Sequence, residues 1–291
     1  MPEIWTIGKV LGFAVPFFAG KNLPNPRLDA EVLLAYVLRN DRIFLYSHYD
    51  TPLSSEELAC YRAVIMRRAQ GEPVAYITGF KEFMSLNFAV SPQVLIPRPD
   101  TETLVVAAIE LAGSQQLRMI ADVGTGSGAI AISVAHYTQD LNTQVWATDC
   151  SAEALAVARK NAQDLGADVC FSQGNLLAPL LQDNIQLDLL LANLPYIPAG
   201  DAAALPPDVR DFEPPLALFA GADGLDCYRE LLPMAVEILK PGGFMLWEID
   251  DSQADPVSAL VAPQFPAPEI IRDLARSEEH TSELQSRSAI S

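Results

Sequence analysis

The sequence predicts an α/β domain built on a parallel sheet, preceded by a small all-helical domain. Its 291 residues are more than one ordinary domain needs. From residue 101 onward, short apolar segments alternate with helical segments, which is typical of a parallel sheet with helices on both faces. One of the apolar segments runs directly into a glycine-rich turn at 124–128, as a strand does before a ligand-binding helix.

Residues 1–75 are expected to form the helical domain. Apolar side chains recur at helical spacing over 28–38. Residues 51–57 offer an N-cap followed by an acidic first turn, which predicts the start of another helix. We expect this bundle of helices to end near Arg68.

Residues 76–100 are expected to link the two domains as a β-hairpin. β-Branched and aromatic residues dominate this segment, first in the run from Tyr76 to Gly79 and then in the run from Leu86 to Val90. Such runs are typical of strands, and their closeness in the chain favours a hairpin.

The α/β domain is expected to span residues 101–275. Strands are predicted at 118–123, 144–149, 168–172, 187–192 and 243–249. Helices are predicted at 101–113, 128–138, 152–165 and 226–239. The strands are almost continuously apolar, as strands buried on both faces are. A proline-rich loop from Pro195 to Pro215 interrupts the alternation, and long loops of this kind are usually functional.

Composition and charge exclude several classes of protein. The four cysteines form no C-x-x-C pair and there are three histidines, so we expect no metal site and a reduced, cytoplasmic protein. The longest apolar stretch, residues 10–20, is too short to span a membrane. The net charge is −18 and arises after residue 100, because the first 100 residues hold ten basic and ten acidic side chains. Such acidity repels nucleic-acid backbones, so we expect no direct nucleic-acid partner.

Residues 276–291 are expected to be a non-native tail. Their composition differs from the rest of the chain, and residues 276–286 back-translate codon by codon into a common sequencing adapter. The alternative is an ordinary polar, frayed C-terminus. A foreign tail implies that the natural last strand is lost, and we then expect an unpaired sheet edge and lower stability.

Two features at the ends of neighbouring predicted strands favour a nucleoside cofactor. The first strand is followed by a loop of Gly124, Thr125, Gly126, Ser127 and Gly128. The next strand ends in Asp149, whose carboxylate can accept hydrogen bonds from both ribose hydroxyls. Such a loop alone also fits a dinucleotide site or a tight turn, and Asp149 also fits a neighbour of a helix N-cap.

The strand predicted at 187–192 ends in Asn193, Leu194, Pro195 and Tyr196. This sequence resembles the Asn-Pro-Pro-Tyr motif of methyltransferases that use S-adenosylmethionine to methylate a planar nitrogen of adenine, cytosine or glutamine. Such a nitrogen is a poor nucleophile because its lone pair is delocalised. The Asn193 amide and the Leu194 carbonyl can accept its two N–H groups and stabilise developing positive charge, while Tyr196 stacks on the planar group.

Four further segments resemble one family within this class. They are residues 68–79, 94–105, 209–218 and 221–226. Together they are similar to the PrmC (HemK) family of peptide chain release factor glutamine methyltransferases, over roughly residues 22–275. The resemblance implies a Rossmann-like S-adenosylmethionine-dependent methyltransferase domain and a helical N-terminal domain that docks the release factor. It also implies methylation of the side-chain amide nitrogen of glutamine in a Gly-Gly-Gln motif.

The resemblance also implies roles for single residues. The loop 124–128 wraps the methionine end of S-adenosyl-L-methionine, and Asp149 holds its ribose. Asn175 and Leu176 lie near the adenine. Asn193 through Tyr196 hold the target glutamine, and Asn193 also lies beside the cofactor. The implied partner is a release factor, and we expect the enzyme to be a monomer.

Leu194 departs from the family motif, which has proline at this position. Leucine frees Asn193 and adds an N–H donor beside the two acceptors. This leaves open a chain that binds cofactor and release factor but turns over poorly.

Two other enzymes are alternatives. A ribosomal-protein glutamine methyltransferase is related, but it usually has Pro-Arg-Ser-Pro where this chain has Pro97–Asp100. A DNA adenine methyltransferase shares the chemistry, but the acidic net charge speaks against it.

Overall fold

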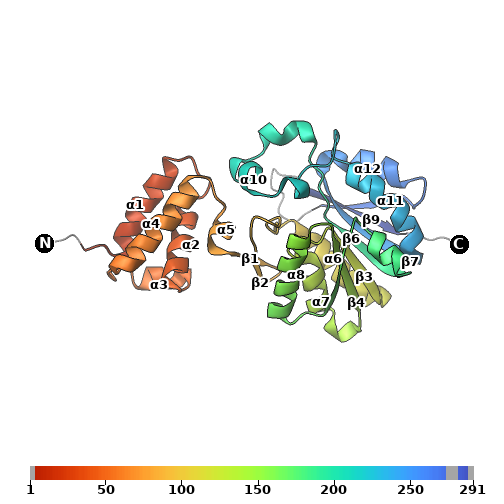
Figure 1. The fold of residues 1–291 in the computed structure, drawn as a ribbon, viewed down its shortest axis with the longest axis horizontal. Coiled ribbons are helices and arrows are strands. Elements are labelled where there is room, and N and C mark those ends of the chain that lie inside the picture. The colour runs from red at the N-terminus through yellow and green to blue at the C-terminus, as the bar shows by residue number, and fades with distance from the viewer. Residues whose placement is uncertain (1–3, 273–280, 288–291) are drawn as a thin grey trace. The chain divides into compact units, whose positions relative to one another are not determined.

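The structure is a computed structural model that describes residues 4–272 and 281–287. The chain divides into two compact units, which are coloured along the chain in Figure 1. The first unit holds the residues up to Gly79 together with Pro206–Phe212. The second holds Phe80–Leu205 and the residues from Glu213 onward.

The first unit is helical, as predicted. Its helices are α1 (Ile7–Ala19), α2 (Pro26–Leu38), α3 (Arg42–Ser47), α4 (Ser55–Ala69), α5 (Val74–Thr78) and α10 (Pro207–Phe212). A capping box explains where α4 begins, because Ser54 accepts from the Glu57 backbone and Glu57 accepts from the Ser54 backbone. Phe18 and Leu33 are fully buried in the core of this bundle.

The segment from Pro195 to Pro215, predicted as a loop, is partly helical. It contains a short 3-10 helix, η2 (Ala199–Ala204), and α10. The second of these helices belongs to the first unit, where the Asp208 carboxylate lies 3.8 Å from the Arg68 guanidinium. Sequence periodicity did not reveal α10 because it is short and rich in charge.

The predicted β-hairpin exists, but its first strand begins later than expected. Residues Tyr76–Gly79 were predicted as strand and are instead the end of α5 and its cap. Pro73 begins this helix and Gly79, with φ of +80°, ends it. The hairpin consists of β1 (Phe80–Phe83) and β2 (Leu86–Ala89).

The second unit is built on a seven-stranded sheet with the strand order β5-β4-β3-β6-β7-β9-β8. Its strands are β3 (Met119–Val123), β4 (Gln144–Asp149), β5 (Val169–Gln173), β6 (Leu187–Ala192), β7 (Leu239–Asp250), β8 (Glu269–Arg272) and β9 (Thr281–Arg287). The five strands β3 to β7 pair in parallel, which confirms the predicted parallel sheet.

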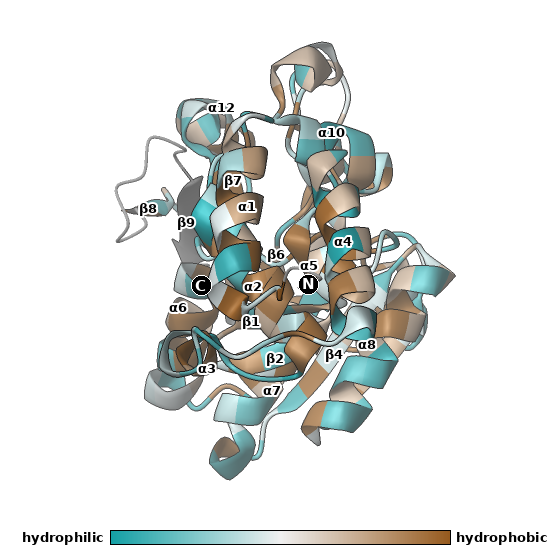
Figure 2. Cartoon of the chain, turned by 90° about the vertical axis from the view of Figure 1, so that its left-hand side faces the viewer, coloured by the Kyte–Doolittle hydropathy of each residue, from teal (hydrophilic) through white to brown (hydrophobic). Residues whose placement is uncertain are grey.

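Helices cover both faces of this sheet. The long helices are α6 (Thr101–Gln115), α7 (Ala129–Tyr137), α8 (Ala152–Leu165), α11 (Asp226–Ile238) and α12 (Ala254–Val261), and α9 (Ala178–Gln182) is a single short turn. The helices α6, α7 and α8 contribute to one core cluster, and α9, α11 and α12 to the other. Figure 2 shows hydrophilic and hydrophobic residues alternating along α8, as in a helix with one buried side.

The expectation of an unpaired sheet edge was wrong. Strand β9 pairs antiparallel with β7, from Phe244 opposite Arg287 to Asp250 opposite Thr281, and β8 pairs with β9. A ladder is formed by backbone groups, so a segment of any origin that lacks proline can supply a strand. Residues 276–280 and 288–291 of the suspected non-native tail lie outside the described residues, and its foreign origin stays a prediction.

Two properties of the described residues bear on the expected membrane and metal partners. None of the helices described is both long enough and apolar enough to cross a membrane. Within the same residues, no group of three or more His, Cys, Asp and Glu side chains is placed to hold a metal ion.

Candidate active site

A cavity of about 400 Å³ opens in the second unit, where the carboxyl ends of its parallel strands meet. Most of the residues predicted for cofactor and substrate binding line it. They are Gly124, Thr125, Gly126, Ser127, Asp149, Asn175, Leu176, Asn193, Leu194 and Pro195. Gly128 and Tyr196 do not line the cavity. A volume of this size is typical of a small-molecule site.

The glycine loop leads from β3 into α7 with a backbone that favours glycine. Gly124 has φ of +72° and Gly126 has φ of +56°. A Cβ atom on Gly124 would lie 2.7 Å from Cδ2 of Leu194, so the loop and the Asn193 segment pack tightly against each other. The Thr125 hydroxyl donates to Asp122 Oδ2 at 2.6 Å and anchors the turn to the end of β3. The loop is therefore held in a fixed shape along the cavity wall.

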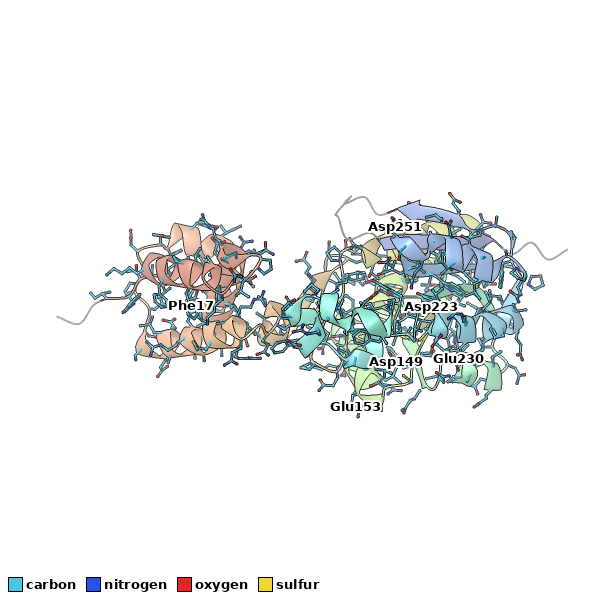
Figure 3. All side chains as sticks on the ribbon, turned by 90° about the horizontal axis from the view of Figure 1, so that it is seen from above. Phe17, Asp149, Glu153, Asp223, Glu230 and Asp251 are labelled. Atoms are coloured by element: carbon cyan, nitrogen blue, oxygen red, sulfur yellow. The ribbon has the colours of Figure 1, made fainter. Side chains whose placement is uncertain are left out.

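Asp149 joins the glycine loop to the start of α8. Its Oδ2 accepts from the Gly126 N–H at 2.9 Å, and its Oδ1 accepts from the Ser151 N–H at 2.9 Å. Ser151 is the N-cap of α8, so the N-cap neighbour considered from the sequence is also present. Figure 3 labels Asp149 and Glu153, and both side chains line the cavity. The predicted carboxylate therefore stands at the cavity wall on a rigid support.

Asn175 and Leu176 form another part of the wall, after β5. The Asn175 amide donates to Glu230 at 2.5 Å, which connects this segment to α11. Leu176 adopts φ of +48°, an uncommon value for leucine. Apolar side chains such as Leu176, Ile130 and Leu95 line the same cavity, so a flat ring can lie against them.

The Asn193 segment leaves β6 beside the glycine loop. The Asn193 Nδ2 donates to Thr101 Oγ1 at 3.1 Å. Leu194 is 3% exposed. Its N–H, the additional donor expected from the missing proline, donates to the Tyr228 hydroxyl at 3.4 Å, and that hydroxyl donates to the Glu248 carbonyl. The extra N–H therefore has a partner and does not compete at the two acceptors.

Tyr196 is fixed through its backbone and does not line the cavity. Gln253 donates from Nε2 to the Tyr196 carbonyl at 2.9 Å and to the Asp223 carbonyl at 3.3 Å. Burial raises the pKa of the Tyr196 phenol above its usual value, so this hydroxyl stays protonated. Gln253 was not identified from the sequence, because its contact with Tyr196 joins segments far apart in the chain.

Arg98 and Glu102 have partners within the second unit. The Arg98 guanidinium pairs with Glu213 Oε1 at 2.5 Å, and Glu213 Oε2 accepts from the Ile96 N–H at 3.3 Å. Glu102 accepts from the Met84 N–H at 2.8 Å. Glu213 is 3% exposed, so this pair fastens the segment before α6 to the segment after α10. Arg98 also lines the cavity, where it carries a positive charge.

Two buried carboxyl groups lie beneath the cavity. Burial raises the pKa of Asp122, at the end of β3, to about 7, although hydrogen bonds from Thr125 and the Ala131 N–H oppose the shift. Burial likewise raises the pKa of Glu248, near the end of β7, to about 7. Sequence analysis missed Glu248, although a single acid inside the apolar run of β7 was a visible signal.

Because the pKa values of Asp122 and Glu248 are raised, we expect the protein to lose stability as pH rises from about 5 to about 7. Their ordinary pKa values are 3.8 and 4.5, so the unfolded chain releases both protons near pH 5 while the folded protein keeps them up to about 7. The free energy of unfolding should then fall by on the order of 1 kcal/mol per pH unit for each group. Urea unfolding at several pH values measures this, and a midpoint that rises with pH in this window would contradict it.

Comparisons with known proteins agree with this architecture. A family model described as the PrmC N-terminal domain matches residues 9–79, and a model described as a methyltransferase domain matches residues 120–212. A protein of Geobacter sulfurreducens named release factor glutamine methyltransferase is 44% identical over 259 residues, which are 89% of each chain. The chain belongs to the release factor glutamine methyltransferase family. The family resemblance inferred from the sequence is thereby confirmed.

A second relative with the same name, from Moorella thermoacetica, is 47% identical to this family member over 257 residues, 88% of this chain and 89% of the relative. Among solved structures, the human METTL16 catalytic domain in complex with an RNA hairpin matches with a TM-score of 0.58. It covers 89% of this chain and 93% of that chain at 15% identity. The N-terminal domain of human METTL16 in complex with SAH matches with a TM-score of 0.53 at the same identity, over 89% of this chain and 94% of that chain. At this identity the match concerns the fold alone, and it confirms the Rossmann-like methyltransferase fold.

Proposed function

We propose that this chain transfers a methyl group from S-adenosyl-L-methionine to the side-chain amide nitrogen of the glutamine in the Gly-Gly-Gln motif of peptide chain release factors. The supporting observation is that one cavity, in a member of this family, brings the Asn193 segment against the glycine loop and Asp149. Both relatives described above carry the name of this activity.

The cavity fits the cofactor chemically. The Asp149 carboxylate suits a ribose diol, the apolar wall at Leu176 suits an adenine ring, and the glycine loop suits a close approach of the methionine end. When bound, S-adenosyl-L-methionine supplies an electrophilic methyl group on a positively charged sulfur. No proton acceptor is needed beforehand, because the amide nitrogen is neutral when it attacks.

The residues of the Asn193 segment orient the target. The Asn193 Oδ1 and the Leu194 carbonyl accept the two N–H groups of the glutamine amide and direct the nitrogen lone pair toward the methyl group. As the nitrogen–carbon bond forms, the methyl–sulfur bond breaks and its electron pair stays on sulfur. Positive charge therefore grows on the nitrogen, and both oxygens stabilise it. One N–H proton then leaves to solvent, and the amide is neutral again. Tyr196 stays protonated and does not line the cavity, so we assign it to supporting the Asn193 segment, through its bond from Gln253, and not to stacking on the planar group.

The helical unit is proposed to dock the release factor, and the enzyme is proposed to act as a cytoplasmic monomer without direct contact to nucleic acid. The net charge of −18 supports the last point. The partner found for the Leu194 N–H supports an active enzyme over a poorly active copy.

The proposal is tested with full-length release factor and S-adenosyl-L-methionine carrying a labelled methyl group. Label should enter the natural release factor and not a version whose Gly-Gly-Gln glutamine is replaced by alanine. A Leu194→Pro variant run in parallel should be active to within about tenfold, because the backbone carbonyl that accepts survives. Label that enters a ribosomal protein and not the release factor would contradict the proposed substrate.

Replacing Gly124 with alanine should impair transfer by about tenfold or more, because the new Cβ meets the buried Leu194 side chain and shifts the Asn193 segment. Gly166→Ala is the matched control. That residue has a similar φ of +65° against +72° at Gly124, but nothing lies within 4 Å of its added Cβ. Both variants carry backbone strain, and only the first touches the site. Equal transfer rates for the two variants at equal folded fractions would contradict the role of this contact.

A further inference from the structure

We propose that Glu248 is a positioning residue that holds the Asn193 side-chain amide with its NH2 group inward and its oxygen toward the cavity. The inference rests on the proposed function, in which the Asn193 Oδ1 accepts an N–H of the target glutamine. Glu248 belongs neither to the Asn193–Tyr196 motif nor to the cavity lining.

The pairing of β6 with β7 places Glu248 beside Asn193. Ala192 lies opposite Trp247 in the parallel register. Asn193 follows Ala192 in the chain and Glu248 follows Trp247, so these two residues are neighbours across the strands. Glu248 is 1% exposed and Thr101, the first residue of α6, is 4% exposed. Three segments far apart in the sequence therefore bring a carboxyl, a hydroxyl and an amide together beneath the cavity wall.

The hydrogen bonds of Thr101, Asn193 and Glu248 determine which end of the Asn193 amide faces inward. The Asn193 Nδ2 donates to Thr101 Oγ1 at 3.1 Å, so the Thr101 hydroxyl hydrogen remains to be donated onward. Hydrogen bonding with the Thr101 and Asn193 side chains favours the ionised form of Glu248. An ionised carboxylate accepts hydrogen bonds and donates none. It therefore favours the NH2 group of Asn193 on the inner side and leaves the amide oxygen for the cavity.

Packing alone does not account for an acid at this position. Glu248 Oε2 has no hydrogen-bond partner, and no basic side chain of the described residues forms an ion pair with this carboxylate within 4.0 Å. The nearby Arg98 guanidinium pairs with Glu213 instead. Burying a carboxylate that has no ion-pair partner destabilises a fold. A group that opposes stability and yet faces the candidate catalytic amide is best explained by its effect on that amide.

Several charged and titratable groups surround Glu248. Arg98 lowers its pKa and Asp100 raises it, both from the segment before α6. Tyr196 after β6, Tyr228 on α11 and Asp250 at the end of β7 share this electrostatic environment. Burial dominates and raises the pKa of Glu248 to about 7. The ionised form, which orients Asn193, is therefore populated above about pH 7, and transfer should speed up as pH rises through this value.

The test is Glu248→Gln, which keeps the shape but can both donate and accept. We expect kcat at about pH 8 to fall about a hundredfold, with KM for the release factor and Kd for the cofactor within about twofold of the unsubstituted values. The rise of kcat near pH 7 should disappear. Glu237→Gln, the same chemical change at an exposed position of α11, should alter none of these values. An unchanged kcat and pH profile in Glu248→Gln, or a parallel loss of cofactor affinity, would overturn the proposal.

A second readout does not depend on methyl transfer. The Asn193 side-chain NH2 resonances, assigned by their loss in Asn193→Asp, should shift with pH near 7 in the unsubstituted protein and not in Glu248→Gln. If the chemical shifts of these resonances change neither with pH nor with the Glu248→Gln substitution, the positioning role is overturned even in an active enzyme. If the unsubstituted chain transfers no methyl group, the proposed function fails, and the NMR titration still decides whether Glu248 orients Asn193.

Discussion

Replacing Asn193 with alanine is expected to lower kcat for glutamine methylation by on the order of a thousandfold. The variant loses the side-chain oxygen proposed to accept one N–H of the target. It also loses the NH2 group that donates a hydrogen bond to Thr101 Oγ1 at 3.1 Å. The charge that grows on the target nitrogen then has one acceptor in place of two. Cofactor affinity should fall by less than about tenfold, because the glycine loop and Asp149 are unchanged. Single-turnover transfer to full-length release factor, with cofactor binding measured separately, checks both expectations.

Asn40→Ala is the control for this change. Asn40 is exposed in the helical unit, and its side-chain amide donates to the Leu38 carbonyl at 2.9 Å. Its substitution should leave the transfer rate unaltered. An Asn193→Ala enzyme that retains at least about a tenth of the unsubstituted rate would show that the amide does not act on the target nitrogen.

Asp149→Ala should weaken binding of S-adenosyl-L-methionine by about 10- to 100-fold, as expected when a charged hydrogen-bonding group is lost. The carboxylate lines the cavity and also holds the glycine loop and the start of α8 in place, because it accepts hydrogen bonds from the Gly126 N–H and the Ser151 N–H, both at 2.9 Å. Removing it therefore loosens the glycine loop and takes away the acceptor proposed for the ribose. Isothermal titration calorimetry with the cofactor or its demethylated product measures the change.

Asp140→Ala supplies the matched control for charge. Asp140 is exposed on a 3-10 helix, η1 (Gln139–Leu141), and its loss changes the net charge by the same amount. The two variants together separate a local contact from the general effect of an acidic surface. Cofactor affinity within about twofold of the unsubstituted value in Asp149→Ala would contradict the assignment.

The sequence predicted those parts of the fold that local patterns determine. Apolar runs and glycine turns located the strands β3 to β7, and the carboxyl ends of these strands meet at one edge of a parallel sheet. The predicted loop 124–128, Asp149 and Asn193 therefore came together as expected, apart from Gly128 and Tyr196, which do not line the cavity.

Contacts between distant segments could not be predicted in the same way. Thr101 and Glu248 lie on different elements from Asn193, and their meeting depends on strand order and register. The partner of the Leu194 N–H could not be predicted for the same reason, because Tyr228 lies on α11, far from Leu194 in the sequence. Short elements with few apolar residues were also missed, as α10 shows.

Tandem mass spectrometry of the release factor after the reaction shows whether the methyl group arrives on the side chain of one glutamine. We expect a single added methyl group, localised by fragmentation to the glutamine of the Gly-Gly-Gln peptide and absent when Asn193→Ala replaces the unsubstituted enzyme. A methyl group on any other residue, or an unmodified peptide from a folded enzyme that binds its cofactor, would contradict this expectation.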